Sequence, residues 1–206
     1  VVSGAKGLSD PSQWSQGGWG GRFGNQKVKN YPSTFNRIID ETPYQDYFMY
    51  PDVSGSWSYQ GTLYNNIYVP IARWRKDIQN DFAARMDWSS TDSYCAVNHN
   101  PFVIVNNDSL PAIMRIAAEP NITVTLNAEL SYDPDNDSLS FEWFRYNEAG
   151  SYPGDVILKN SASNKAFVTI PKDIDENDIH IILRVVDNGV PQLCAYKRII
   201  IHRKNK

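Results

Sequence analysis

The second half of the chain carries a period-two pattern of apolar residues, and this pattern constrains the fold more than any other feature. Short apolar segments, most of them alternating with polar residues, are separated by clusters of Pro, Gly, Asn and Asp; they are 122–130, 139–143, 166–170, 179–185 and 196–202. Successive side chains of a strand point to opposite faces of a sheet, so alternation predicts strands with one buried face. A run of short strands joined by turns favours an antiparallel β-sandwich of immunoglobulin-like type.

The first half contains one clear helical pattern, over residues 70–88. At 3.6 residues per turn, the apolar residues of an amphipathic helix fall on one side; they are Ile71, Trp74, Ile78, Phe82 and Met86. On a flank of this face, Asp77 and Asp81 lie one turn apart between Trp74 and Trp88. Two acids at this spacing repel each other unless a positive charge lies nearby. Arg85 is one candidate for that charge, and a metal ion, or an array of sugar hydroxyls under the indoles, is the other.

Length and charge bound the organisation of the chain. Its 206 residues, at roughly one hundred per domain, predict two domains, which we place at 1–104 and 105–206, with 106–111 as a linker. The net charge is −3, with nine basic and nine acidic residues in the first half and eleven and fourteen in the second. This distribution provides no basic face, which disfavours a nucleic-acid partner. An apolar run of eighteen residues is absent from the sequence, so we expect no membrane span.

Aromatic residues are concentrated early in the chain, where fourteen of the 26 lie between residues 1 and 74. The segment GGWGGRFG at 17–24 places Trp19 between paired glycines, with Arg22 close behind. Glycine permits positive φ and a close approach of the backbone to a ligand, so this segment is either a ligand-lining loop or a tight turn with a buried indole. Further aromatic residues either stack on sugar rings or cover a core; they are Tyr44, Tyr47, Tyr50, Trp57 and Tyr59.

The segment DPDND places Asp133, Asp135 and Asp137 at every second position. This spacing is similar to the start of a calcium loop, but an EF-hand needs glycine where Ser138 stands and glutamate where Phe144 stands. The segment is therefore not an EF-hand. A turn with side-chain hydrogen bonds is the default interpretation, and bound calcium is the alternative.

His99 lies in the polar, turn-like segment AVNHNP at 96–101. It either caps a turn or binds a ligand near neutral pH, where a histidine changes charge. Cys95 and Cys194 are the only cysteines, and their spacing fits no metal site. We expect two free and mostly buried thiols, with a disulfide between the halves as the alternative.

Several motifs together resemble those of a known family. They are GGWGGRF at 17–23, RWRKDIQNDFAARMDW at 73–88, NHNP at 98–101, DPDND at 133–137, EWFRYNEAGSYPGDV at 142–156 and IHIILRVVDNGVPQL at 179–193. The chain is similar to secreted bacterial proteins, described as cellulose-binding, that pair a nucleoside hydrolase-like domain with a C-terminal immunoglobulin- or cadherin-like domain. The implied fold class is α+β, in which 1–104 is the last part of an α/β domain and 105–206 is the sandwich.

The resemblance also implies roles for particular residues. In nucleoside hydrolases a His-Asp pair opens a helix, with the Asp bound to calcium, and Asn80-Asp81 is similar to that step. Asp81 would then be a calcium ligand, and the residues proposed to contact substrate are Trp19, Arg22, Trp74 and His99. Asparagine at position 80 cannot donate a proton as histidine does. Calcium needs roughly six to eight oxygens, which one helix cannot supply, so this chain alone should not be a competent hydrolase without the missing N-terminal part of its domain.

Two functions follow from these residues. The first is a secreted or periplasmic protein that binds a carbohydrate, a cellulose-like glucan, through its aromatic residues. The alternative is a calcium-dependent hydrolase of glycosidic bonds that is incomplete in this chain. A third interpretation makes the sandwich a spacer without a ligand of its own.

Overall fold

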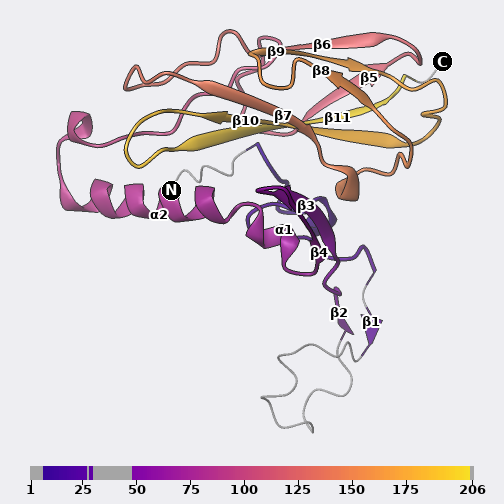
Figure 1. The fold of residues 1–206 in the computed structure, drawn as a ribbon, viewed down its shortest axis with the longest axis horizontal. Coiled ribbons are helices and arrows are strands. Elements are labelled where there is room, and N and C mark those ends of the chain that lie inside the picture. The colour runs from indigo at the N-terminus through magenta and orange to yellow at the C-terminus, as the bar shows by residue number, and fades with distance from the viewer. Residues whose placement is uncertain (1–6, 27, 30–47, 205–206) are drawn as a thin grey trace, which may run out of the picture.

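The computed structural model describes residues 7–26, 28–29 and 48–204, and within them two sheets form the larger body (Figure 1). One sheet has four strands, in the order β5 (Met114–Ala118), β11 (Cys194–Arg203), β10 (Asp178–Val186) and β7 (Ser140–Arg145). The other has three strands, in the order β6 (Thr123–Asn127), β9 (Lys165–Thr169) and β8 (Ile157–Lys159). The two sheets lie face to face as a β-sandwich.

Each of the five apolar segments overlaps one of these strands. The sandwich is not wholly antiparallel, however, because β5 pairs in parallel with β11, with Ile199 opposite Met114 and Arg203 opposite Ala118. The short strands β5 and β8 lie outside the segments predicted from the sequence.

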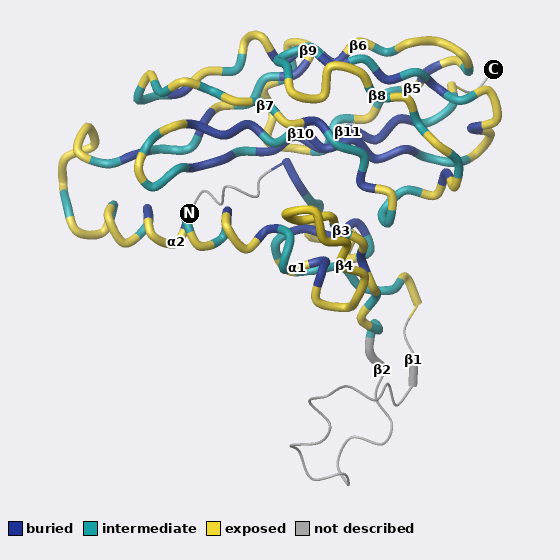
Figure 2. Tube along the Cα trace, viewed as in Figure 1, coloured by how far each residue is buried: buried dark blue, intermediate teal, exposed yellow. Residues whose placement is uncertain are grey.

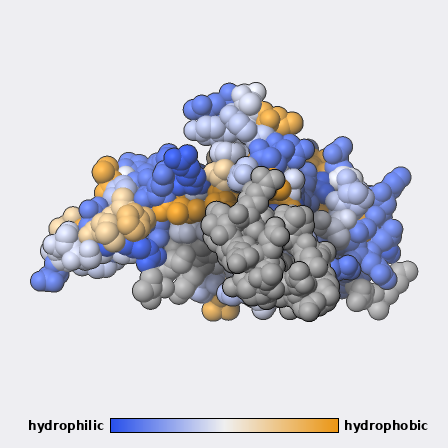
Figure 3. All heavy atoms as spheres, turned by 90° about the horizontal axis from the view of Figure 1, so that it is seen from below, coloured by the Kyte–Doolittle hydropathy of each residue, from blue (hydrophilic) through white to orange (hydrophobic). Residues whose placement is uncertain are grey.

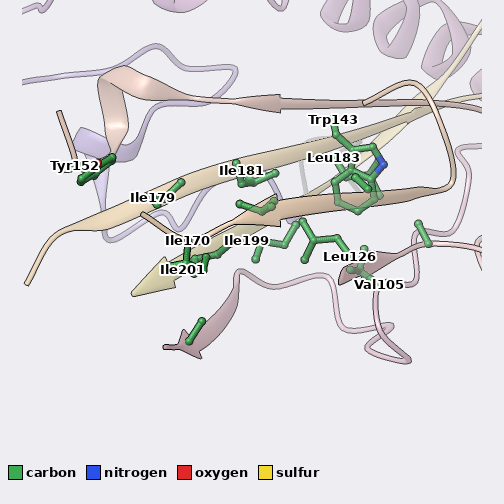
Figure 4. Packing of buried hydrophobic residues seen from close by; sticks show 14 of the residues in the cluster. Val105, Leu126, Trp143, Tyr152, Ile170, Ile179, Ile181, Leu183, Ile199 and Ile201 are labelled. Atoms are coloured by element: carbon green, nitrogen blue, oxygen red, sulfur yellow. The ribbon is translucent and has the colours of Figure 1, made fainter. Parts of the chain in front are cut away.

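The core of the sandwich is made by the inward faces of both sheets (Figure 4). Ile181 and Leu183 of β10 meet Leu126 of β6 across it, and all three are fully buried. Trp143 of β7 fills the space beside Leu183, and its indole nitrogen donates a hydrogen bond to the carbonyl of Ser163 at 2.7 Å. The inward residues of β10 are the odd-numbered ones, as the alternation predicts.

Strands β10 and β11 are buried on both faces, not on one (Figure 2). Their outward side chains form a second core cluster with residues from the first half of the chain. Its buried members are Leu8, Trp74, Tyr146, Ile182, Val186, Cys194 and Tyr196. The first half of the chain therefore packs directly onto the outer face of the four-stranded sheet.

The first half consists of short elements around one longer helix. They are the 3-10 helix η1 (Trp14–Gln16), strands β1 (Val28–Lys29), β2 (Phe48–Met49), β3 (Gly55–Tyr59) and β4 (Thr62–Asn66), helices α1 (Val69–Ala72) and α2 (Arg75–Ser90), and η3 (Tyr94–Ala96). A further 3-10 helix, η4 (Asn147–Ala149), follows β7 in the second half. The pairs β1–β2 and β3–β4 are antiparallel.

The predicted fold class is wrong. In the described part of residues 1–104, antiparallel two-stranded sheets and the helices α1 and α2 stand where an α/β nucleoside hydrolase-like portion was expected. A parallel α/β sheet needs strands joined by helical crossovers, whereas here the strands of each pair run in opposite directions. The molecule is mostly β-sheet. The prediction was wrong because it rested on short motifs of the first half, and such motifs do not show that the strands of a parallel sheet are present.

The inward side of helix α2 matches its apolar pattern only in part. Asp77, Asp81 and Ala84 are its buried residues, whereas Phe82 is 62% exposed and Met86 48% exposed. In the view from below, apolar atoms lie among hydrophilic ones on the side of the molecule where α2 runs (Figure 3). The acidic flank of the helix therefore meets the sandwich together with the start of the apolar face, where Trp74 is buried and Ile78 packs against the second core cluster.

The two cysteines are free thiols, as expected, but only one of them is buried. Cys194 lies in the second core cluster, and burial, followed by the charge of Asp77, raises the pKa of its thiol. Cys95 is exposed in η3, which corrects the expectation that both thiols are mostly buried.

A buried histidine ties the sheet to the N-terminal segment. His180 Nδ1 lies 2.9 Å from Arg198 Nη1, and His180 Nε2 lies 3.3 Å from an oxygen of Asp178. The fully buried Arg198 also donates to the carbonyls of Leu8 and Gly17. Donation by Arg198 requires an unprotonated Nδ1, so this network holds the neutral form of His180.

We expect this network to make the protein less stable as the pH falls below about 6.5. Burial lowers the pKa of His180, with Arg198 and Arg115 adding to the effect and Asp178 opposing it. The unfolded chain therefore binds a proton before the folded chain does, and stability is lost from about pH 6.5 downward through the lowered folded pKa. Asp178, with a pKa of about 2, stays charged over this range.

Thermal unfolding at pH 7.5 and pH 5.5 checks this expectation. The loss in Tm between the two pH values should be smaller in His180→Gln than in the wild type, because glutamine does not titrate. Equal losses in the two proteins would contradict it.

Candidate functional site

Trp74, proposed from the sequence to contact substrate, lies inside the molecule at 2% exposure. Its ring meets Tyr146 and Tyr196 edge to face, with centroid distances of 6.1 and 5.6 Å. One turn further along α2, the Asp77 carboxylate accepts hydrogen bonds from Arg184 and from the Tyr196 hydroxyl. Trp74 therefore joins the two halves of the chain and presents no open ring face.

Trp19 and Arg22 belong to a turn that packs on the same cluster. The indole nitrogen of Trp19 lies 3.5 Å from the Tyr196 hydroxyl. Gly17, with φ at 74°, approaches Tyr146 so closely that a Cβ would lie 2.5 Å from the Tyr146 hydroxyl oxygen. Arg22 donates to the Ser54 carbonyl at 2.7 Å, beside β3. This geometry is that of a tight turn. Arg22 contacts the residue just before β3 and so supports the start of that strand.

Asp81 is paired with the guanidinium of Arg85. The distance from Arg85 Nε to Asp81 Oδ2 is 2.6 Å, and Asp81 is 6% exposed. Calcium binds roughly six to eight oxygens, and in the described ranges no three His, Cys, Asp or Glu side chains converge as a metal site would require. The described residues around Asp81 therefore lack the further ligands that calcium needs. The role of Asp81 as a calcium ligand stays a prediction from the resemblance.

The DPDND segment forms the turn that was the default interpretation. Asp133 Oδ1 accepts hydrogen bonds from the backbone N–H groups of Asp135 at 2.8 Å and Asp137 at 3.3 Å. The other oxygen of Asp133 is buried without a partner, and burial raises the pKa of this carboxyl. Calcium binding by this turn stays a prediction.

His99 lies at the surface end of the molecule that follows α2. Its ring is sandwiched between Tyr94, at a centroid distance of 3.7 Å, and Trp88, at 5.8 Å, with interplanar angles of 13° and 9°. Asp135 fixes it, accepting from the His99 backbone N–H at 2.7 Å and lying 3.1 Å from Nδ1. The structure thus brings His99 to an exposed aromatic group after the end of α2, whereas Trp74 lies at the start of that helix.

Another exposed aromatic group lies on the β3–β4 hairpin. Trp57 and Tyr59 project from the same face of β3, with ring centroids 4.8 Å apart and an angle of 27°. Tyr64 is the cross-strand partner of Trp57 and therefore shares that face. Tyr59 is 48% exposed and Tyr64 43% exposed. We call Trp57, Tyr59 and Tyr64 the hairpin aromatic face.

Local sequence explains why the hairpin holds this face out rigidly. Gln60 and Gly61 both have positive φ, as a two-residue hairpin turn with the twist of its strands requires. At the base of the hairpin, Arg73 donates to the Ser56 carbonyl at 2.6 Å, and the Ser56 N–H donates to Glu148 at 2.7 Å. The aromatic side chains are thus carried on a strand pair that is tied to both halves of the chain.

The sequence pointed to Trp57, Tyr59 and His99 but not to their aromatic neighbours. Tyr64 had a readable signal, because a two-residue turn at 60–61 places it opposite Trp57. Tyr94, which stacks on His99, had no such signal in the sequence, because this contact depends on where helix α2 ends and on the path of the chain after it. Tyr44 and Tyr47 lie outside the described residues.

Comparison with known proteins finds sequence and fold similarity to proteins described in terms of carbohydrate. Residues 123–203 match the family model of the C-terminal domain of the cellulose-binding protein Sde0182. A solved structure of a nucleoside hydrolase-related hypothetical protein from Saccharophagus degradans, described as associated with carbohydrate metabolism, is 41% identical to this chain with a TM-score of 0.81. That match covers 97% of this chain and 45% of the other, so this chain spans less than half of the relative's length.

Two further solved structures match more weakly. The PKD domain from the KIAA 1837 protein is 20% identical with a TM-score of 0.32, and the match covers 46% of this chain and 81% of that one. The protocadherin gamma B4 extracellular domain is 18% identical with a TM-score of 0.34, and the match covers 50% of this chain and 17% of that one. At these scores neither supports an argument about this chain. No protein with a curated description matches it.

Among residues 7–26, 28–29 and 48–204, no helix has the length and apolar character needed to cross a membrane.

Proposed function

We propose that the protein binds a neutral polysaccharide, such as a cellulose-like glucan, through the hairpin aromatic face. The observation that carries this proposal is the set of three aromatic side chains, Trp57, Tyr59 and Tyr64, on one face of a two-stranded ribbon, where both tyrosines are exposed and Trp57 is half-buried. Aromatic rings offer a flat apolar surface that matches the C–H faces of sugar rings, while the Tyr hydroxyls remain available for hydrogen bonds. The family matched by residues 123–203 is named for cellulose binding and supports the same ligand class.

Binding is proposed in preference to hydrolysis because of the placement of the residues. Trp19 and Trp74 pack against the Tyr196 cluster, and Asp81 is held by Arg85 at 2.6 Å. The hairpin aromatic face needs no rearrangement to meet a long ligand. Because an insoluble polymer does not enter cells, this function also requires a secreted or periplasmic protein.

Retention on insoluble cellulose tests the proposal. We expect the wild type to be retained and Trp57→Ala to bind about tenfold more weakly, which corresponds to roughly 1.4 kcal/mol of lost aromatic contact. Trp57→Phe keeps an aromatic ring at the same position and should retain most of the binding. Absence of retention of the folded wild type would refute the proposed function.

A further inference from the structure

A second exposed aromatic surface lies beyond the far end of α2 from the hairpin. It is formed by Tyr94, His99, Phe102 and Tyr132, which come from η3, from the segment after it and from the turn before β7. Tyr94, Phe102 and Tyr132 are 58%, 54% and 51% exposed. We call these four residues the second aromatic surface.

Its rings are held in fixed, nearly parallel pairs. Phe102 and Tyr132 stack with centroids 5.0 Å apart at 6°, and their backbones exchange two hydrogen bonds of 2.8 and 3.1 Å. Tyr94 stacks on His99, whose position is set by Asp135 on one side and by Trp88 behind it. Side chains held by backbone bridges and by a hydrogen-bonding carboxylate need little ordering when a ligand arrives, which favours binding.

The polar groups around these rings are acidic. The pKa of the Tyr94 hydroxyl is raised, first by partial desolvation and then by the nearby carboxylates of Asp135 and Asp133. Asp135 lies three residues after Tyr132 and accepts from the His99 N–H at 2.7 Å, which brings the segment of Tyr132 to the His99–Tyr94 pair. Tyrosine hydroxyls donate hydrogen bonds to sugar hydroxyls and accept them, whereas the nearby carboxylates repel an anionic polymer.

We propose that the second aromatic surface is another binding site for a neutral, hydroxyl-rich glycan, so that the protein contacts a polymer at two places. This inference rests on the proposed function and extends it. The hairpin lies near the start of α2, and Tyr94 follows its end, so the sixteen residues of the helix separate the surfaces by roughly 24 Å at 1.5 Å per residue.

Two separated sites on a rigid body make binding to a polymer bivalent. When one site is occupied, the second meets other parts of the polymer at a high effective concentration, and the overall affinity exceeds that of either site. A three-sugar ligand is too short to reach both surfaces and gains nothing from this effect. Polymer and short ligand should therefore respond differently to the loss of one surface.

The test compares the double variant Tyr94→Ala/Tyr132→Ala with Tyr94→Phe/Tyr132→Phe, which keeps both rings. We expect the alanine pair to bind insoluble cellulose about tenfold more weakly than the wild type, in line with the loss of aromatic contacts. The phenylalanine pair should stay within about threefold of the wild type. Combining the alanine pair with Trp57→Ala should abolish retention. Cellotriose titrated into Trp57→Ala should still bind at the second surface, and alginate should not displace it.

The outcomes separate this inference from the proposed function. If Trp57→Ala weakens binding and the alanine pair leaves it unchanged, the second site is refuted while the proposed function stands. If the wild type does not bind cellulose, both fail. Should the alanine pair unfold, as judged by its melting temperature, Phe102→Leu removes one flat ring at similar volume, and unchanged binding in that variant would refute the second site.

Discussion

Replacing Asp77 by alanine is expected to lower the free energy of unfolding by about 3 kcal/mol, as found when one partner is removed from a buried ion pair. Asp77 is 7% exposed, and Arg184 donates to its carboxylate from both Nε and Nη2. The Tyr196 hydroxyl donates to the same carboxylate. Burial opposes the charge on Arg184, but hydrogen bonding to Asp77 and its charge raise the pKa of Arg184 overall. Without Asp77, a guanidinium and a hydroxyl lose their acceptor in a desolvated place.

Urea unfolding followed by tryptophan fluorescence measures this change. The control is Glu142→Ala, which removes the other carboxylate near Arg184, at 3.3 Å and with a side chain 60% exposed. Exposed ion pairs contribute about 0–1 kcal/mol, so this control should change stability little. Because Asp77 is on α2 and Arg184 on β10, a loss below about 1 kcal/mol in Asp77→Ala would show that this contact does not hold the helix on the sheet.

Replacing Trp143 by alanine is expected to cost about 3–5 kcal/mol. Trp143 is 2% exposed at the centre of the sandwich core, and its removal leaves a large cavity between the sheets (Figure 4). The Ser163 carbonyl would also lose the hydrogen bond from the indole nitrogen. Loss of buried apolar area, the cavity and an unpaired carbonyl act in the same direction.

Thermal and urea unfolding check the effect, with Trp57→Ala as the matched control. The same chemical change on the hairpin aromatic face removes a half-buried side chain that stacks on Tyr59 of a surface ribbon, so its effect on stability should be smaller, about 1 kcal/mol. Equal losses in the two variants would contradict the assignment of Trp143 to the core and of Trp57 to a binding surface.

The strands of the second half could be read from the sequence, but their burial on both faces could not. Alternation marks Ile181 and Leu183 as inward residues because strand side chains alternate strictly. The outward residues Ile182 and Arg184 are also covered, since the first half packs onto that face. Nothing in the local sequence of β10 says what covers its second side.

For the candidate site, the sequence indicated aromatic residues, and the structure places them at different depths in the molecule. Trp19 and Trp74 were both candidates for ligand contact from the sequence, Trp19 with a tight turn as the alternative, and in the structure both pack against Tyr196. A tryptophan between glycines, or within a helical segment, has the same local sequence pattern whether its indole is exposed or buried. Trp57 differs because Gln60 and Gly61 set a hairpin turn, and the pairing of two strands then fixes which face it shares with Tyr64.

The sequence by itself determined five of the sandwich strands and one helical region, which was predicted at 70–88 and is found as α1 (Val69–Ala72) and α2 (Arg75–Ser90). The departure of DPDND from the EF-hand spacing is also a property of the sequence alone. Strand period, helix period and ligand spacing are local properties, so no distant residue is needed to read them. The tertiary structure alone decided that the acidic flank of α2 turns inward, because only the fold brings Arg184 and Tyr196 opposite Asp77. A buried carboxylate is stable only where hydrogen-bonding partners are present. The partners of Asp77 are Arg184 and Tyr196, which lie more than a hundred residues away in the chain.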